Sequence, residues 1–167
     1  KHENYKLHRI DITDQKALND VFAHSSPPLT KGGTQGGFDI ICHLAAQAGA
    51  RYSIDHPDEY IETNIKGTLN VFEAARSHSV KNIVFASSSS VYGSNPVPWS
   101  ESQAVDEPIN PYGASKRATE LFAYTYHKLY GLNMTALRFF TVYGPWGRPD
   151  MAYFKWVDAI TKGKPID

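Results

Sequence analysis

The residues between Ser87 and Lys116 suggest the first chemistry in this sequence. Four serines, Ser87 to Ser90, open the stretch, and Tyr112 and Lys116 close it as a Tyr-x-x-x-Lys pair. If residues 111–130 form a helix, the two side chains lie one turn apart on the same face. A free tyrosine has a pKa of about 10, so it needs a nearby ammonium to favour the phenolate at neutral pH. The pair predicts proton transfer by Tyr112, with Lys116 lowering the pKa of its phenol.

A serine hydroxyl from the same stretch is expected to hold a substrate oxygen against that phenol. Ser88, three residues before Val91, is the first choice for this role, and Ser89 is the second. A structural interpretation is also open. The pair then marks an exposed helix start with an incidental lysine, and the serines only satisfy backbone groups of a turn.

Composition narrows the class of protein. The 167 residues suffice for about one domain with a real core. Equal numbers of acidic and basic residues, 17 each, give no sign of a nucleic-acid partner. No apolar run is long enough to span a membrane, and no signal peptide is expected. The single cysteine, Cys42, fits a reducing compartment such as the cytoplasm. Nothing near His43 has metal-ligand spacing, so no metal is predicted.

Strand and helix patterns alternate along the chain, which indicates an α/β fold with a mainly parallel sheet. The run at 38–44 is almost continuously apolar and is typical of a strand buried on both faces. Residues 25–37 are rich in Ser, Pro and Gly and are expected to form a surface loop. Strands are predicted at 5–10, 38–44, 82–86 and 133–140, and helices from Thr13 or Asp14 onward and at 58–77, 111–130 and 151–162.

Small or polar residues follow each predicted strand. Ligands of such sheets bind beyond the carboxyl ends of the strands. Four clusters fall there, and their coincidence is hard to explain as packing: Asp11, Ala45 to Gln47, Ser87 to Ser89, and Thr141.

Several of these stretches together resemble the extended short-chain dehydrogenases, and among them the NAD-dependent nucleotide-sugar epimerases. The resemblance covers nearly the whole chain apart from 25–37, and it implies a Rossmann-like doubly wound parallel sheet with bound NAD. The matching stretches are Asp11-Ile12, His43-Leu44-Ala45-Ala46-Gln47, Asn64, Ser87 to Gly93, Tyr112 to Lys116 and Arg138 to Gly144.

The resemblance also implies roles for single residues. Asp11 would hold the adenine amine, Ile12 would meet the adenine ring, and Lys116 would also hold the nicotinamide ribose. The catalytic residues would be Ser88, Tyr112 and Lys116. NAD would be bound by Asp11, Ile12, Leu44, Ala45, Ala46, Gln47, Asn64, Ser87, Tyr112, Lys116 and Phe139, and the UDP-sugar by Ser88, Ser89, Thr141 and Arg148.

The sequence departs from the family pattern at both ends. The glycine-rich turn that receives the pyrophosphate is expected before residue 1, and most of the substrate-binding region after residue 167. We therefore interpret residues 1–167 as a partial NAD-binding domain, with 141–167 leading into the substrate-binding region. This piece alone is expected to be inactive. A non-catalytic remnant or binding domain is an alternative.

The serine run and the loop after residue 140 favour one branch of the family. Ser89 and Ser90 stand where related dehydratases and decarboxylases carry acidic residues, which favours epimerases. Residues 138–152 resemble the UDP-glucuronate 4-epimerases, so Arg148 is predicted to bind the sugar carboxylate. Alternatively, Arg148 is a loop residue paired with Asp150. The predicted reaction converts UDP-glucuronate to UDP-galacturonate through a 4-keto sugar, and 4-epimerisation of UDP-glucose or UDP-galactose is the second choice.

The helices at 58–77 and 111–130 carry apolar residues on more than one face. Phe72, Leu121 and Leu129 are examples. In related enzymes the matching helices pair into a four-helix bundle. A homodimer is therefore predicted for the parent protein.

Overall fold

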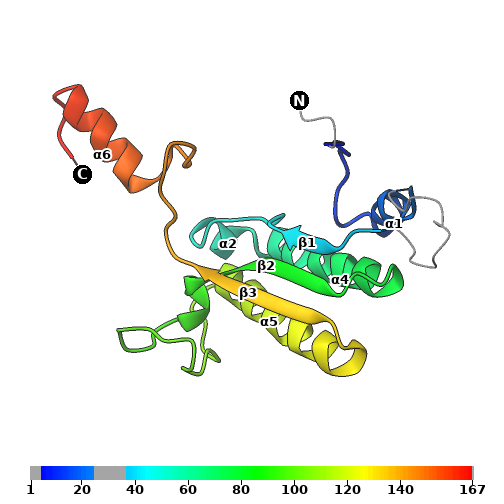
Figure 1. The fold of residues 1–167 in the computed structure, drawn as a ribbon. Coiled ribbons are helices and arrows are strands. Elements are labelled where there is room, and N and C mark those ends of the chain that lie inside the picture. Colours follow the sequence, from blue (N-terminus) through cyan, green and yellow to red (C-terminus); the bar gives the residue numbers. More distant parts are fainter. Residues whose placement is uncertain (1–4, 25–36, 167) are drawn as a thin grey trace.

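The computed structural model describes residues 5–24 and 37–166. Its sheet has three parallel strands in the order β1-β2-β3: β1 (Ile40–His43), β2 (Asn82–Ser88) and β3 (Asn133–Phe139). The helices α4 (Thr68–Ser77) and α5 (Pro111–Tyr130) lie on one face of this sheet (Figure 1). This arrangement confirms the predicted α/β class with parallel strands.

The helix predicted over 58–77 is three segments in direct succession. They are α3 (Pro57–Tyr60), the π-helical segment η1 (Ile61–Gly67) and α4. π-Helical turns are rare and occur often at functional sites. The remaining helical elements are α1 (Gln15–His24), α2 (Tyr52–Asp55), the 3₁₀ turn η2 (Ser89–Tyr92) and α6 (Ala152–Thr161), of which α2 and η2 were not predicted.

Helix α5 begins and ends where the sequence predicts. The side chain of Asn110 accepts a hydrogen bond from the N–H of Gly113 at 2.8 Å. Pro111 occupies the first helical position, where no backbone donor is needed. Gly131 ends the helix with φ 68°, a left-handed conformation that glycine adopts without strain. Helix α1 is capped by Asp14, whose carboxylate accepts the N–H of Ala17 at 3.0 Å.

The main core lies between the sheet and the helices on its covered face. Phe72 of α4 meets Phe85 of β2 edge to face, with ring centroids 5.6 Å apart, and both side chains are inaccessible or nearly so. Helix α1 adds Leu18 and Phe22 to the same cluster. A smaller cluster of Val91, Tyr92 and Val105 anchors the segment after η2.

Two strand predictions are corrected. Residues 5–10 are extended but are not a strand, because a strand exists only through pairing and no described strand pairs with them. The run at 38–44 forms a strand only over Ile40–His43, and it is not buried on both faces. Ile40 is 61% exposed, since the described helices cover a single face of the sheet. β2 also extends two residues beyond the predicted 82–86.

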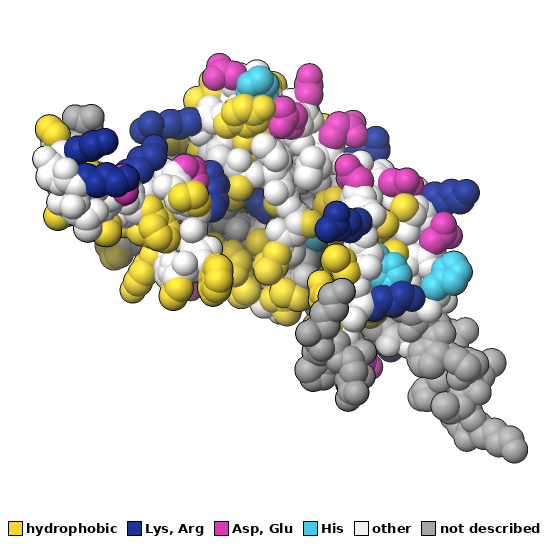
Figure 2. All heavy atoms as spheres, turned by 90° about the horizontal axis from the view of Figure 1, so that it is seen from above, with side chains coloured by type: hydrophobic (Ala, Val, Ile, Leu, Met, Phe, Trp, Pro, Cys, Tyr) yellow, Lys and Arg dark blue, Asp and Glu magenta, His cyan; other side chains and the backbone are white. Residues whose placement is uncertain are grey.

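Apolar side chains are exposed where the described helices do not cover the sheet. Figure 2 shows hydrophobic side chains gathered side by side along part of the surface. Exposed hydrophobic residues of the sheet include Ile40, Leu137 and Phe139, and Phe140 directly after β3 is exposed as well. Helix α6 stands apart from the sheet (Figure 1) and has no buried residue. None of the helices within 5–24 and 37–166 is long and apolar enough to cross a membrane. The predicted surface loop lies almost entirely in 25–36, outside the described residues.

Candidate active site at the carboxyl ends of the strands

The carboxyl ends of the three strands bring three of the four predicted clusters to one edge of the sheet, and Asp11 does not follow a described strand. His43 pairs with Phe85 in register, and Ser88 pairs with Phe139. The chain leaves these strands through 44–50, η2 and 140–151. The segments that hold the predicted cofactor and substrate residues therefore start side by side.

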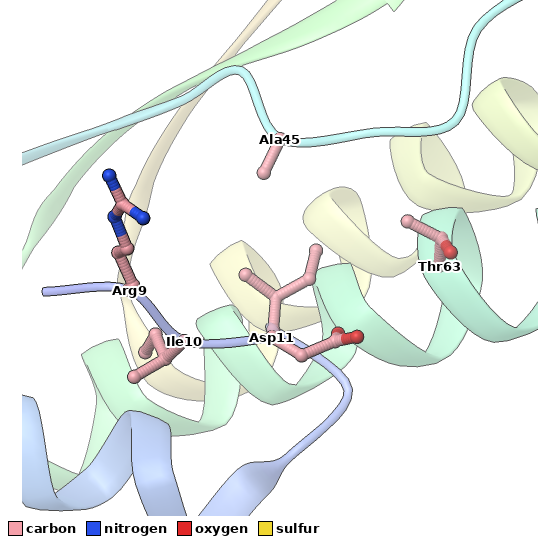
Figure 3. Close-up of a pocket in the computed structure, with 6 residues that line it drawn as sticks. Arg9, Ile10, Asp11, Ala45 and Thr63 are labelled. Atoms are coloured by element: carbon pink, nitrogen blue, oxygen red, sulfur yellow. The ribbon is translucent and has the colours of Figure 1, made fainter.

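A cavity of about 520 Å³ lies between the extended segment before α1 and the chain that follows β1. Figure 3 shows the carboxylate of Asp11 extending toward the helical segment that carries Thr63, with Ala45 across the gap. Three predicted cofactor residues, Asp11, Ile12 and Ala45, thus line one cavity, together with Arg9, Ile10 and Thr63. Leu44 adjoins this stretch and is exposed, as is Ala45, while Ala46 is half-buried.

Hydrogen bonds favour the ionised form of Asp11, which can accept further hydrogen bonds. One carboxylate oxygen receives both the N–H and the hydroxyl of Thr13 at 2.8 Å each. These two hydrogen bonds hold the pKa of Asp11 below its usual range. The neighbouring Ile12 packs onto Gly67 of η1, where a Cβ atom would come within 2.6 Å of the Ile12 side chain. Glycine at 67 therefore lets Ile12 approach the helix closely.

Tyr112 and Lys116 lie one turn apart at the start of α5, as predicted. Lys116 is only 5% exposed, and its Nζ donates to the carbonyl of Ala86 in β2 at 2.7 Å. Burial lowers the pKa of Lys116 from 10.5 to about 8. Tyr112 is half-buried, and its ring meets Tyr60 edge to face at 6.0 Å.

His43 lies next to this buried ammonium. One ring nitrogen, Nε2, lies 2.9 Å from the hydroxyl of Thr68. Burial, with a smaller contribution from the charge of Lys116, lowers the pKa of His43 to about 4. A neutral, packed histidine agrees with the sequence interpretation of this residue. Within 5–24 and 37–166, no group of three or more His, Cys, Asp or Glu could hold a metal ion.

The serines of the run have separate partners. The hydroxyl of Ser88 accepts the N–H of Ser90 at 3.1 Å and so caps η2. A hydroxyl that accepts one bond keeps its own proton for another acceptor. Ser87 donates to Glu120 of α5 at 2.6 Å, so its hydroxyl is directed into the protein. Ser89 is half-buried in η2.

Asn64 ties the chain after β1 to helix α5 from within the π-helical segment. It is fully buried. Its side chain accepts the N–H of Gln47 at 2.8 Å and donates to the carbonyl of Gln47 at 3.1 Å. The same amide donates to Ser115 at 2.9 Å. Asn64 therefore sets the position of Gln47 relative to the helix that carries Tyr112.

The predicted substrate residues after β3 are less enclosed. Phe139 is 40% exposed, and Thr141 is exposed. Arg148 pairs with Asp150 through Nε at 3.0 Å and Nη2 at 2.5 Å, and both side chains are more than half exposed. This is the pairing that the sequence left open as an alternative. The charge of Arg148 also interacts with Tyr60 and Tyr112, while its hydrogen bonds go to Asp150.

The sequence analysis did not identify a second polar group, which Ser87 contacts from the serine run. Glu120 follows Lys116 by four residues on α5, and it receives both Nε and Nη2 of Arg138 at 3.0 Å. The Arg138 guanidinium also lies over the ring of Tyr92 at 5.0 Å. This group joins β3, α5 and η2 beside the site. The four-residue spacing from Lys116 was a signal that could have identified Glu120.

Comparisons with known proteins agree with this site. The model of the NAD dependent epimerase/dehydratase family matches residues 1–167. The UDP-glucuronate 4-epimerase 4 of Arabidopsis thaliana is 53% identical over 158 residues, which are 93% of this chain and 34% of that protein. The UDP-N-acetylglucosamine 4-epimerase of Methanobrevibacter ruminantium superimposes with a TM-score of 0.83 and 33% identity, over 98% of this chain and 50% of that one.

A third similar protein was solved with ligands. It is the UDP-glucuronic acid 4-epimerase of Bacillus cereus in complex with UDP-glucuronic acid and NAD, with a TM-score of 0.76 and 32% identity, over 95% of this chain and 46% of that one. The chain spans about half the length of the curated relatives it matches. The match to the family model over the whole sequence, together with these identities, shows that the chain belongs to the NAD dependent epimerase/dehydratase family.

Proposed function

We propose that this chain carries the acid–base residues of an NAD-dependent UDP-sugar 4-epimerase whose substrate is UDP-glucuronate. The observation that carries the proposal is the pair on α5, with Tyr112 half-buried and Lys116 buried at the carboxyl end of β2. Members of this family with similar sequence are named UDP-glucuronate 4-epimerases.

In this mechanism Tyr112 takes the proton of the 4-hydroxyl and later returns it. Ser88 accepts the N–H of Ser90 with one lone pair, which leaves its proton to donate to the reacting oxygen. The ammonium of Lys116 stabilises the charge that develops on the phenol, and it would hold a ribose hydroxyl of NAD. Lys116 and Ser88 are buried, and electrostatic interactions are stronger there than in water.

The residues that line the cavity fit the adenosine part of NAD. Asp11 is an ionised acceptor suited to an exocyclic amine, and Ile12 offers an apolar surface to a flat ring. Ala45 and Ala46 are small enough for a ligand to approach the backbone, and Gln47 is held in place by Asn64. When bound, NAD supplies the hydride acceptor and donor that epimerisation at carbon 4 requires.

UDP-glucose is the second candidate substrate, and one observation favours it. The guanidinium of Arg148 already has a carboxylate partner in Asp150. If that pair persists with substrate bound, Arg148 shapes the loop and has no role in choosing a carboxylate. The substituent at carbon 6 of the sugar is then bound by other residues.

The proposal is tested by following the 4-epimerisation of UDP-glucuronate and UDP-glucose by NMR with the full-length protein. We expect conversion of UDP-glucuronate, and we expect Tyr112→Phe to reduce the rate by about 10²–10⁴-fold with the fold unchanged by circular dichroism. Conversion of UDP-glucose alone would favour the second candidate. Wild-type turnover in Tyr112→Phe would refute the role of the phenol.

A further inference from the structure

The backbone of Tyr112 is held from outside its own helix. The first N–H groups of an α-helix have no partner within the helix. In α5, Pro111 has no N–H, and Asn110 accepts the N–H of Gly113 at 2.8 Å. The N–H of Tyr112 is accepted at 3.1 Å by the hydroxyl of Ser53, a residue 59 positions earlier in the chain.

Ser53 has no exposed surface, and its hydroxyl serves two segments. Its oxygen accepts from Tyr112, and its proton goes to the carbonyl of Ala50 at 2.6 Å. The hydroxyl thus joins the start of α5 to the chain that follows β1. That chain includes Ala45 to Gln47, where we propose that the cofactor binds.

Tyr60 supports the same junction. Its single proton is shared between the carbonyls of Gly49 at 2.7 Å and Ala48 at 3.1 Å. Its ring packs edge to face on the ring of Tyr112, and it has no exposed surface. The carbonyls of residues 48, 49 and 50 are all bound by side chains from 52–60. The segment that touches Tyr112 is therefore rigidly attached to the chain beside the cavity.

We propose that Ser53 is a positioning residue, which sets the place of the Tyr112 phenol relative to the chain at 45–50. The inference rests on the proposed role of Tyr112 in proton transfer. Removing the hydroxyl frees the N–H of Tyr112 and lets the first turn of α5 shift. A shift of about 1 Å in a catalytic group can reduce a rate by about 100-fold. Binding of the substrate depends on other contacts and is affected less.

The test compares the full-length wild-type protein with Ser53→Ala in steady-state epimerisation and in amide hydrogen exchange. We expect kcat to fall by at least about tenfold while KM stays within about twofold. We also expect the Tyr112 amide to exchange at least about tenfold faster. Ser102→Ala, an exposed serine outside the site, is the matched control and should leave both readouts unchanged.

Ser53→Cys separates the loss of the hydrogen bond from the loss of side-chain volume. A thiol fills the volume but accepts hydrogen bonds weakly, so this variant should also lose kcat and amide protection. Unchanged kcat in Ser53→Ala, or unchanged exchange at Tyr112, would overturn the inference. If the wild-type protein epimerises no UDP-sugar, the proposed function fails, and the exchange at Tyr112 alone decides whether Ser53 holds this residue.

Discussion

Lys116 keeps an ammonium group where water hardly reaches it. Its Nζ donates to the carbonyl of Ala86, and burial lowers its pKa from 10.5 to about 8. That shift corresponds to about 3 kcal/mol against the charged form. Stability alone would not select a charge at this position. The proton transfer that we propose for Tyr112 would give a reason to keep it, in line with the common conflict between activity and stability.

Lys116→Met should therefore stabilise the protein and abolish its activity. Methionine has a similar length and no charge to desolvate, so we expect the free energy of unfolding at pH 7 to rise by about 1–3 kcal/mol. Urea titration measures this, and Lys81→Met at an exposed site is the control.

The pH dependence gives a second check on Lys116. Between about pH 8 and pH 10.5 the unfolded chain binds the lysine proton and the folded chain does not. Raising the pH through this window therefore favours the folded wild-type protein. Lys116→Met should lack that contribution. A less stable Lys116→Met at pH 7 would contradict the desolvation argument.

Variants of Arg148 distinguish between the two proposed substrates. A charge-assisted hydrogen bond is worth about 1.5–3 kcal/mol, so Arg148→Ala should lower kcat/KM for UDP-glucuronate by about 10–100-fold. The effect on UDP-glucose should be small, and Arg148→Lys should restore only part, because the planar fork is lost. Steady-state assays with both sugars measure this.

Asp150→Asn is the matched variant, since it weakens the existing pair and leaves the guanidinium in place. We expect it to retain most activity toward UDP-glucuronate. Equal losses on both sugars in Arg148→Ala would show that this arginine only supports its loop.

At the scale of elements, the start of α5 lies unusually close to η2. A Cβ atom at Gly113 would come within 2.6 Å of the carbonyl oxygen of Ser90 and 3.3 Å of Pro108. The backbone of a 3₁₀ turn cannot yield as a flexible side chain can. Glycine at 113 therefore permits the contact that brings Tyr112 next to the serine run.

Gly113→Ala should push α5 and η2 apart. We expect the free energy of unfolding to fall by about 1–3 kcal/mol, as in other overpacked sites, and the activity to fall with it. Thermal unfolding and epimerisation assays measure the two effects. Gly37→Ala is the control, because a Cβ atom there meets nothing within 4 Å. A fully active, equally stable Gly113→Ala would show that the two elements can separate without consequence.

At the scale of the whole molecule, α5 and η1 expose several large apolar side chains. Leu121, Tyr124 and Leu129 of α5 are 53%, 63% and 66% exposed, and Ile61 of η1 is 52% exposed. Apolar residues gathered on neighbouring helices are typical of an interface. We therefore propose that the full-length protein is a homodimer through these helices.

Light scattering of the full-length protein should give the mass of a dimer. Leu121→Glu combined with Leu129→Glu should give a monomer, because charged side chains would have to be buried without partners. Val97→Glu, at a site that is 76% exposed and outside these helices, should remain dimeric. A monomer mass for the wild-type protein at working concentration would refute the proposal.

The sequence by itself determined the features that depend on local chemistry and periodicity. The limits of α5 follow from Asn110, Pro111 and Gly131, whose conformational preferences act within a few residues. The parallel α/β order follows from alternating strand and helix patterns. The shared edge of Ala45 and Ser88 follows from the rule that ligands gather at the carboxyl ends of strands. Asp11 lines a cavity with Ala45 although the segment before it is not a strand.

Only the tertiary structure decided the features that depend on partners far apart in the chain. Residues 5–10 have a strand pattern without a described partner to pair with, so the pattern did not become a strand. The site around Tyr112 is held by residues 51–59 positions away in the sequence, such as Asn64 on Ser115 and Ser53 on Tyr112. No local pattern encodes such contacts, because a buried hydroxyl or amide takes whichever partner the packed fold brings within reach.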